Sequence, residues 1–362
     1  MKTKLKTVLL ALFVVPLTLL ANNGYFGKGR YTKEKKITKE YSVNSDALLR
    51  IDNSYGNLNI VSWNENRVVI EVTVKTNGNT EGKVQEKLDQ IDVDFNGSSS
   101  QVSAKTIFDR GSRSWWKGWG RNNVSMQINY DIKVPVSNSV NLSNDYGSIS
   151  LNKIEGNATI SCDYGKLSLG ELLGDYNDLN FDYTNNATIE YIKQGKIVAD
   201  YSSFFVDKAG DIDLNTDYTK SEFGELANLD YSCDYGSLKT AVSNNVRGDG
   251  DYLSARMGQV HGNVSVDADY GSFRIEELSP SAGNVSIESD YTGIKIGYHD
   301  EYEFTFNITL EYSGFSGKDD LEMVKQRIKS SDKYYEGYHG STSASNTISI
   351  DSEYGGVSLT KN

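Results

Sequence analysis

Pairs of an acidic residue and a following tyrosine are frequent between residues 145 and 354, and eleven of them recur at near-regular intervals. The spacings between successive tyrosines are 18, 19, 18, 17, 17, 17, 18, 21, 21 and 42, so the last interval is double. A short fixed period is typical of repeat proteins, in which one unit cannot bury its apolar face alone and neighbouring units stack into a common core. The sequence therefore predicts an all-β fold, a single-stranded parallel β-solenoid (β-helix) with about 18 residues per coil. The general preference for right-handed parallel crossovers predicts that the coil is right-handed.

The repeat alternates as a strand does on the approach to each tyrosine. Ile160 and Cys162 precede Tyr164 at even steps, so all three side chains are predicted to point inward. Leu167 and Leu169 follow at odd steps, which indicates a corner directly after the tyrosine. Glycine, serine or threonine usually follows the tyrosine, as expected where the backbone bends and needs a positive φ.

The tyrosines are predicted to stack in an inward-facing structural ladder at the strand spacing of roughly 4.8 Å. A binding role for the rings would require them to face outward. The predicted ladder consists of Tyr146, Tyr164, Tyr183, Tyr201, Tyr218, Tyr235, Tyr252, Tyr270 and Tyr291, with Tyr312 and Tyr354 continuing the pattern.

The acids beside the tyrosines fall on the opposite face by parity and form a second row. Neighbouring carboxylates at this spacing repel by about 1 kcal/mol even in water. Two compensating arrangements are open: hydrogen bonds from corner amides, as in Asx-turns, or a row of weak sites for calcium or another hard cation. The cation candidates are Asp163, Asp234 and Asp251.

Two cysteines in an exported protein invite a disulfide, but Cys162 and Cys233 hold the same repeat position four coils apart. Four strand spacings separate them by about 19 Å. A disulfide needs Cα atoms within roughly 7 Å. The sequence therefore predicts two buried free thiols.

The N-terminus resembles a processing segment. Lysines precede an apolar run from Val8 to Leu20, and Ala21 is a plausible cleavage position, which predicts a signal peptide over residues 1–21. We expect a secreted, periplasmic or cell-surface protein with no lipoprotein cysteine and no transmembrane span. The net charge of −12 argues against a nucleic-acid partner.

The remaining chain divides into three predicted parts. Residues 22–40 read as a polar lead-in, residues 41–135 as a small α+β cap, and residues 136–362 as the solenoid. The cap includes an early copy of the coil around Tyr55 and a short helix opened by Thr80. Its strands are expected near 91–96, 100–108 and 123–135.

The double interval after Tyr312 predicts an insertion over about residues 316–346. Within it, Asp319 to Ser330 are expected to be helical and Tyr334 to Asn346 to form a loop. Thr347 to Leu359 then restore a final coil.

Four tetra- and tripeptides carry a resemblance to a known family: Asn53-Ser54-Tyr55-Gly56, Asn144-Asp145-Tyr146-Gly147, Ser289-Asp290-Tyr291 and Ser352-Glu353-Tyr354-Gly355. Over roughly residues 45–360 the chain resembles the bacterial β-strand-repeat family named putative adhesins, which includes the GIN-type adhesin head domains and related domains of unknown function. The resemblance implies a secreted or envelope-associated β-solenoid with an adhesive role. The family supplies no catalytic or binding residues to carry over.

One tryptophan-rich segment, residues 108–121, stands apart from the repeat. Exposed tryptophans among basic residues could stack on sugars, rest in a membrane interface or contact a protein partner. Alternatively, they fold back over the first coil as a lid. The candidate contact residues are Trp115, Trp116, Trp119, Arg113, Lys117 and Arg121.

Catalytic patterns are missing from the sequence. The three histidines lack metal-ligand spacing, and coils this short leave no room for the loop walls of a polysaccharide lyase. We therefore expect a non-enzymatic, adhesin-like or structural module of the cell envelope, without a cofactor unless calcium binds. Its partner would be an envelope glycan or a surface protein. The alternative is a glycan-binding or glycan-modifying, polysaccharide lyase-like β-helix protein.

Overall fold

The structure, a computed structural model, describes residues 27–109 and 124–362. Strands account for 70 % of the residues and helix for 3 %, and the strands form a long, open and mostly parallel sheet. The chain divides into two compact units, of which unit 1 ends at Leu151 and unit 2 spans Asn152 to Asn362. The boundary therefore falls after the Tyr146 repeat and not at residue 135, where the sequence analysis ends the cap.

Unit 1 is built around its first repeat, strands β2 and β3. β2 lies between β6 and β8, and β3 lies between β7 and β9, all in parallel register. Beyond them, β4 pairs antiparallel with β7, β1 with β4, and β5 with β6. Helix α1 contacts β1, β4 and β5. The elements are β1 (Tyr31–Ser42), β2 (Leu48–Ser54), β3 (Leu58–Trp63), β4 (Arg67–Gly78), α1 (Glu81–Asp89), β5 (Ile91–Gly97), β6 (Gln101–Phe108), β7 (Ser125–Pro135), β8 (Ser139–Asp145) and β9 (Ser148–Ile154).

The predicted cap elements are present in unit 1. Thr80 precedes α1, which buries Val84 and Leu88, and β5, β6 and β7 fall close to the expected ranges. The lead-in differs, because from Tyr31 onward it is the edge strand β1. It carries four lysines and two glutamates, and charge on an edge strand opposes pairing with another chain.

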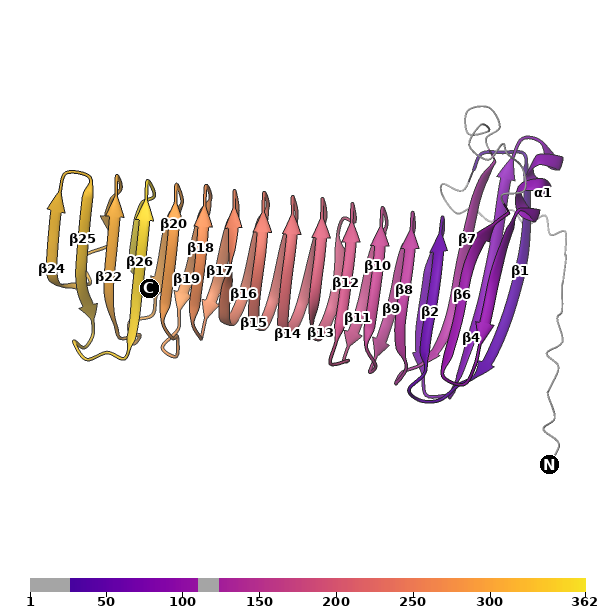
Figure 1. Cartoon of the computed structure of the whole chain (residues 1–362), viewed down its shortest axis with the longest axis horizontal. Helices are drawn as coiled ribbons and strands as arrows, with labels where there is room; N and C mark the ends of the chain where they lie inside the picture. The colour runs from indigo at the N-terminus through magenta and orange to yellow at the C-terminus, as the bar shows by residue number, and fades with distance from the viewer. Residues whose placement is uncertain (1–26, 110–123) are drawn as a thin grey trace. The chain divides into compact units, whose positions relative to one another are not determined.

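Unit 2 repeats one parallel pairing at the sequence period. Asp200 is in register with Asp217, and Asp217 is in register with Asp234. Figure 1 draws these strands side by side in chain order. The strands are β10 (Ala158–Asp163), β11 (Lys166–Leu172), β12 (Asn177–Asp182), β13 (Ala187–Asp200), β14 (Ser203–Asp217), β15 (Lys220–Asp234), β16 (Ser237–Asp251), β17 (Ser254–Val260), β18 (Val264–Asp269), β19 (Ser272–Leu278), β20 (Val285–Asp290) and β21 (Gly293–Tyr298).

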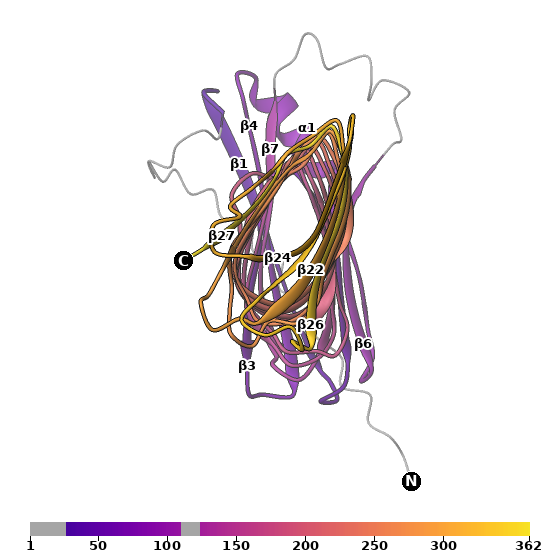
Figure 2. The same cartoon turned by 90° about the vertical axis from the view of Figure 1, so that its left-hand side faces the viewer.

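The two corners of each repeat are built differently. Strands β14, β15 and β16 each hold 15 residues and are interrupted only by a tyrosine and the residue after it. The far corner is a bend within the strand, where backbones approach closely. A Cβ added to Gly210 would lie 1.9 Å from the carbonyl oxygen of Lys193. Viewed along the row in Figure 2, the repeats of unit 2 overlay as a flattened oval.

Inward side chains of both faces fill the interior of unit 2. Phe181, Phe204 and Phe223 pack edge to face, with ring centroids 5.6 and 5.7 Å apart. Cys162 and Cys233 are both buried and neither forms a disulfide, as the stacking register predicts. The alternation before and after each tyrosine therefore identifies the core correctly.

The C-terminal insertion differs from the prediction. The expected helix over Asp319 to Ser330 is wrong, because Glu322–Lys329 is strand β24. The expected loop is also wrong over residues 334–339, because Asp332–His339 is strand β25, whereas residues 340–345 lie outside the strands. β25 pairs antiparallel with both β24 and β22 (Phe304–Glu311). The hairpin that β24 forms with β25 therefore replaces the expected helix.

The final repeat does not lie at the end of the row. β26 (Asn346–Glu353) pairs in parallel with β20 on one side and with β22 on the other. β27 (Val357–Lys361) likewise pairs with β21 and with the short β23 (Phe315–Ser316). Figure 1 shows β26 in yellow between β20 and β22. The chain thus leaves one repeat position open and fills it with its last residues.

Two predictions fall outside the described residues: the signal peptide and the tryptophan-rich segment between Asp109 and Val124. Among the helices that the structure does describe, none is long and apolar enough to cross a membrane.

Replacing Ile197 with alanine tests the core assignment. Ile197 is fully buried on β13, and its neighbour Val198 points outward. We expect Ile197→Ala to lower the free energy of unfolding by about 2–5 kcal/mol, measured by urea denaturation. The matched control Val198→Ala should change it by less than about 0.5 kcal/mol. Equal effects of both changes would contradict the assigned strand faces.

Candidate functional site

The tyrosine ladder of unit 2 lies on the outside. The prediction that the rings point inward is wrong, because the ladder tyrosines are between 46 % and 59 % exposed. Each adopts a φ between +51° and +54°. One residue in the left-handed region reverses the alternation of the strand, so the apolar residues on both sides face inward while the ring does not. The positive φ belongs to the tyrosine and not to the small residue after it.

The exposed rings form one continuous stack in unit 2. Centroids of neighbouring rings from Tyr164 to Tyr291 lie 4.7 to 5.1 Å apart, and the ring planes are within 12° of parallel. The stack then continues to Tyr354 at 4.6 Å and ends at Tyr312, a further 4.8 Å on. In unit 1, Tyr55 and Tyr146 stack in the same way at 5.2 Å.

Backbone hydrogen bonds fix each tyrosine corner to the next. The Tyr235 amide donates to the Asp251 carbonyl oxygen at 2.9 Å, and equivalent bonds recur along unit 2. At Thr184, Ser202 and Thr219, the hydroxyl of the residue after the tyrosine adds two more bonds. Thr219 Oγ1 donates to the carbonyl oxygens of Asp217 and Ala199, both at 2.9 Å. The corner is therefore rigid, and the direction of each ring is set by backbone pairing.

The left-handed corner and the ring stack are energetically linked. A non-glycine residue in the left-handed region costs roughly 1–2 kcal/mol. Stacking an aromatic ring on its neighbour contributes roughly 0.5–1.5 kcal/mol beyond area burial. The two effects are of similar size, so ring stacking offsets the backbone strain. Ring faces are covered by the neighbouring rings, and the ring edges and hydroxyl groups face solvent.

The phenol groups of Tyr201, Tyr235 and Tyr270 remain protonated at neutral pH. Partial burial of the rings, and then the neighbouring tyrosines and aspartates, raise the pKa of Tyr201, Tyr235 and Tyr270 above its usual value. The ladder therefore presents a row of hydroxyl donors to an approaching partner.

The carboxylates beside the tyrosines also point outward, and five of them in unit 2 accept a hydrogen bond from a backbone amide of the neighbouring strand. Asp234 Oδ1 accepts the Asp251 amide at 2.9 Å, and Asp163 Oδ1 accepts the Asp182 amide at 3.3 Å. The sequence suggested that corner amides, as in Asx-turns, would donate hydrogen bonds to these carboxylates. Such amide hydrogen bonds are present, but the donating amide belongs to the next repeat and not to an Asx-turn. Within the described ranges, no group of three or more histidines, cysteines or acids is placed to hold a metal ion.

A dense acidic array borders the tyrosine ladder on β16, β18, β20 and β26. Outward carboxylates occupy two positions on each of these four strands, all in register. None of the ion pairs found in the described part of the chain involves them. The eight residues are Asp249, Asp251, Asp267, Asp269, Glu288, Asp290, Asp351 and Glu353.

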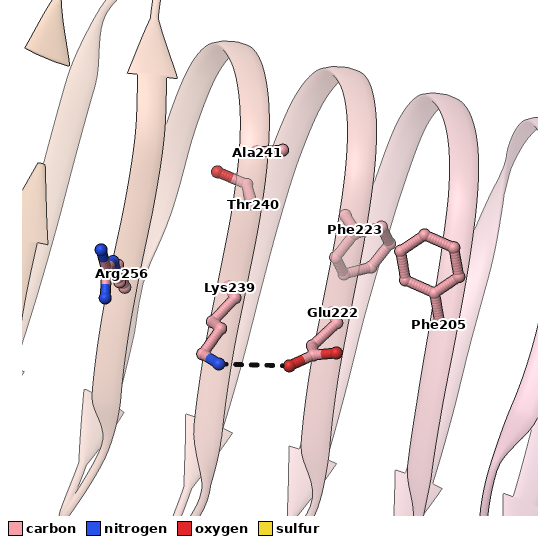
Figure 3. A pocket seen from close by; sticks show the side chains of 7 residues that line it. All are labelled: Phe205, Glu222, Phe223, Lys239, Thr240, Ala241 and Arg256. Carbon is pink, nitrogen blue, oxygen red and sulfur yellow. Dashed lines mark hydrogen bonds and ion pairs between the residues drawn. The ribbon is translucent and has the colours of Figure 1, made fainter. Parts of the chain in front are cut away.

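A shallow hollow of about 220 Å³ lies on a different face of unit 2. Figure 3 shows Phe205 beside Phe223 at one side, and the Lys239–Glu222 ion pair of 3.3 Å below them. Phe205 is 42 % exposed. The hollow lacks the depth of a ligand pocket, which usually encloses at least roughly 300 Å³.

A second hollow, of about 440 Å³, lies in unit 1. It contains Trp63, the one tryptophan outside the predicted loop, whose ring has Arg67 at 4.7 Å and Lys133 at 5.2 Å. Both side chains form cation–π contacts with the Trp63 ring, so the indole already has partners within the protein.

The sequence-predicted contact residues Trp115, Trp116, Trp119, Arg113, Lys117 and Arg121 all lie outside the described residues. The sequence analysis missed the outward ladder as a surface. The signal that could have revealed it is the parity break between Cys162 and Leu167. One residue must leave the alternation there, and Tyr164 is that residue.

No family model matches the chain, and none of the curated proteins matches it. Solved structures give only distant similarity. A "putative cell adhesion protein" from Clostridium sporogenes is 9 % identical, with 92 % of this chain and 100 % of that chain covered and a TM-score of 0.21. A "putative adhesin" from Parabacteroides merdae is 10 % identical, with 90 % and 95 % covered and a TM-score of 0.27.

A "putative lipid binding protein" from Parabacteroides distasonis is 8 % identical, with 90 % of this chain and 96 % of that chain covered and a TM-score of 0.27. TM-scores of this size carry no argument about shared architecture or function. Membership of the adhesin family therefore stays a prediction.

Substitutions at Tyr235 separate backbone strain from ring stacking. Tyr235→Ala removes both ring contacts but keeps the strained φ of +52°, whereas Tyr235→Gly removes the contacts and relieves the strain. We expect the glycine variant to be more stable than the alanine variant by about 1 kcal/mol, measured by urea denaturation.

The control position is Asn215, which points outward from β14. At this position in a regular strand, we expect the Asn215→Ala variant to be more stable than the Asn215→Gly variant. If the alanine variant is more stable than the glycine variant at both positions, the backbone at Tyr235 is not strained.

The acidic row should make the protein more stable at mildly acidic pH. Burial, and then the neighbouring aspartates, raise the pKa of Asp217 and Asp251. A raised folded-state pKa means that the stability from these groups is full at low pH and is lost as pH rises through the raised pKa.

We therefore expect Asp251→Asn to raise the melting temperature at pH 7 and to have no effect near pH 3. The control Asp230→Asn removes the same charge beside Arg247 and should give no gain at pH 7. Scanning calorimetry at both pH values checks this. A gain of equal size at pH 3 would rule out charge repulsion.

Proposed function

We propose that unit 2 is the right-handed, single-stranded β-solenoid that the repeat predicts, and that the protein is an exported, non-enzymatic, adhesin-like interaction module of the cell envelope. Its contact surface is the tyrosine ladder. The observation that supports this is that every repeat of unit 2 holds an aromatic ring outside the core, at a strained backbone position.

The ladder has the properties of a recognition surface. Tyrosine brings a large, rigid and amphipathic contact area at low conformational-entropy cost, and it is enriched in binding surfaces for that reason. Here the stack and the corner hydrogen bonds already order the rings, so little ordering remains to be done on binding. The surface is straight and repeats every 4.6 to 5.1 Å, which favours an extended partner.

The chemistry of the ladder favours a protein partner over a glycan. Sugars stack on exposed ring faces, but the faces inside the ladder are covered by neighbouring rings. The exposed edges and hydroxyl groups lie beside the acidic array of eight carboxylates defined above. Lysine, arginine and amide donors on a surface protein would complement both features.

The proposal also includes the predicted signal peptide and the tryptophan-rich segment. A signal peptide over residues 1–21 would place the protein in the periplasm, on the cell surface or in the medium. The tryptophan-rich loop would be a second contact in unit 1, and no cofactor is required for binding.

The test is attachment of the purified mature chain to an array of envelope proteins and glycans. The ladder variant carries Tyr218→Ser, Tyr235→Ser and Tyr252→Ser. The matched control carries Phe205→Ser, Lys239→Ser and Arg256→Ser, which alter the hollow of Figure 3 on neighbouring repeats. A third variant replaces Trp115, Trp116 and Trp119 with alanine.

We expect the ladder variant to lose attachment and the control to keep it, with circular dichroism showing both folded. Loss only in the tryptophan variant would move the contact to unit 1. Attachment that survives in the ladder variant, or loss only in the control, would overturn the ladder as the contact surface.

A further inference from the structure

The C-terminal segment, residues 346–362, occupies a position in unit 2 that the chain leaves open until its end. Neighbouring repeats elsewhere in unit 2 follow one another directly in the sequence. β26 instead pairs with β20, as in Val285 with Ile348, although β21 to β25 lie between the two strands in the chain. The chain therefore builds β20 and β21, passes one repeat position, builds β22 and β23, and returns.

The segment is held on both sides by the same contacts that join ordinary repeats. The Tyr291 amide donates to the Glu353 carbonyl oxygen, and the Tyr354 amide donates to the Glu311 carbonyl oxygen, both at 2.9 Å. The Tyr354 ring stacks between Tyr291 and Tyr312.

The inward side chains of the segment complete the core. Ile348, Ile350, Val357 and Leu359 are each at most 2 % exposed. If the segment leaves, their sites open and two parallel strand edges, on β20 and β22, face each other unpaired. Unpaired edges bind a complementary strand when one is available.

The connection to β25 suits a hinge. Residues 340–345 read Gly-Ser-Thr-Ser-Ala-Ser, and Gly340 adopts a φ of +78°. The connection is polar and lies outside the regular strands. Small polar residues allow the segment to swing away without breaking core contacts of its own.

We propose that the repeat position between the Tyr291 and Tyr312 repeats is a strand-acceptor site, and that its second occupant is the same C-terminal segment from another copy of this chain. The site accepts β26 and β27 with the register that it holds in one molecule. Reciprocal exchange links two copies with every native contact kept, and this exchange is a low-cost route to a dimer.

The acceptor site is tested on the full chain with a fluorescent synthetic peptide of residues 341–362. The control peptide carries Ile350→Asp and Val357→Asp, which place charges at two buried positions. The chain is warmed with excess peptide below its unfolding midpoint, cooled and separated by size exclusion. We expect the native peptide to be retained and the control peptide to be lost.

A locked variant of the chain identifies the site. Ser349 Oγ donates to Asn307 Oδ1 at 2.8 Å across the β26–β22 pair. Parallel neighbours lie about 4.8 Å apart, within the Cα range that a disulfide bridges. In Asn307→Cys/Ser349→Cys, oxidation should abolish retention of the native peptide and reductant should restore it. Melting curves of both redox forms check that the variant folds.

Exchange between whole molecules is tested with two differently tagged copies of the full chain. After warming at high concentration the tags should co-purify, and light scattering should show a dimer, whereas oxidised locked copies should stay monomeric. Three results would each overturn the proposal: equal retention of both peptides, retention unaffected by the lock, or no retention up to the unfolding midpoint.

Discussion

The left-handed tyrosine is the constraint on which unit 2 depends. One such residue per repeat turns the chain and ends the alternation of the preceding strand, so both flanking segments send their apolar residues inward. A parallel register at the sequence period then places each tyrosine over the next. A shift of the strand pairing by one residue in any repeat would expose the apolar side chains of that repeat to solvent. It would also separate its tyrosine ring from the neighbouring rings. Core, corner and ladder are therefore specified together.

In-register stacking also decides the electrostatics of the surface. Because equivalent positions lie above one another, a charged residue in the repeat becomes a row of like charges. Several carboxylates beside the tyrosines accept a hydrogen bond from an amide of the next repeat, as Asp234 accepts the Asp251 amide. Where a second outward position is also acidic, as at Asp267 and Glu288, repulsion is concentrated. Any ligand of such a surface meets a linear pattern of rings and charges, which suits an extended partner.

Much of the fold could be predicted from the sequence because its signals are local and repeated. The alternation around Ile160 and Leu167, the helix after Thr80 and the lack of a disulfide between Cys162 and Cys233 all follow from periodicity and strand spacing. The direction of the tyrosines could not be predicted in this way. Counting alternate positions assumes extended backbone throughout, and it cannot detect the one residue that adopts a positive φ. The candidate surface was therefore present in the sequence but assigned to the wrong side.

The sequence by itself determined the period, the parallel register and the composition of the core, because each repeat must match its neighbours to bury an apolar face. Only the tertiary structure decided which side the tyrosines occupy and where the last repeat lies. The first depends on backbone conformation at one residue per repeat. The second depends on pairing between strands far apart in the sequence, in which β26 finds matching edges on both β20 and β22. Residues 322–329 are a strand because they form a hairpin with β25, which itself pairs with the more distant β22.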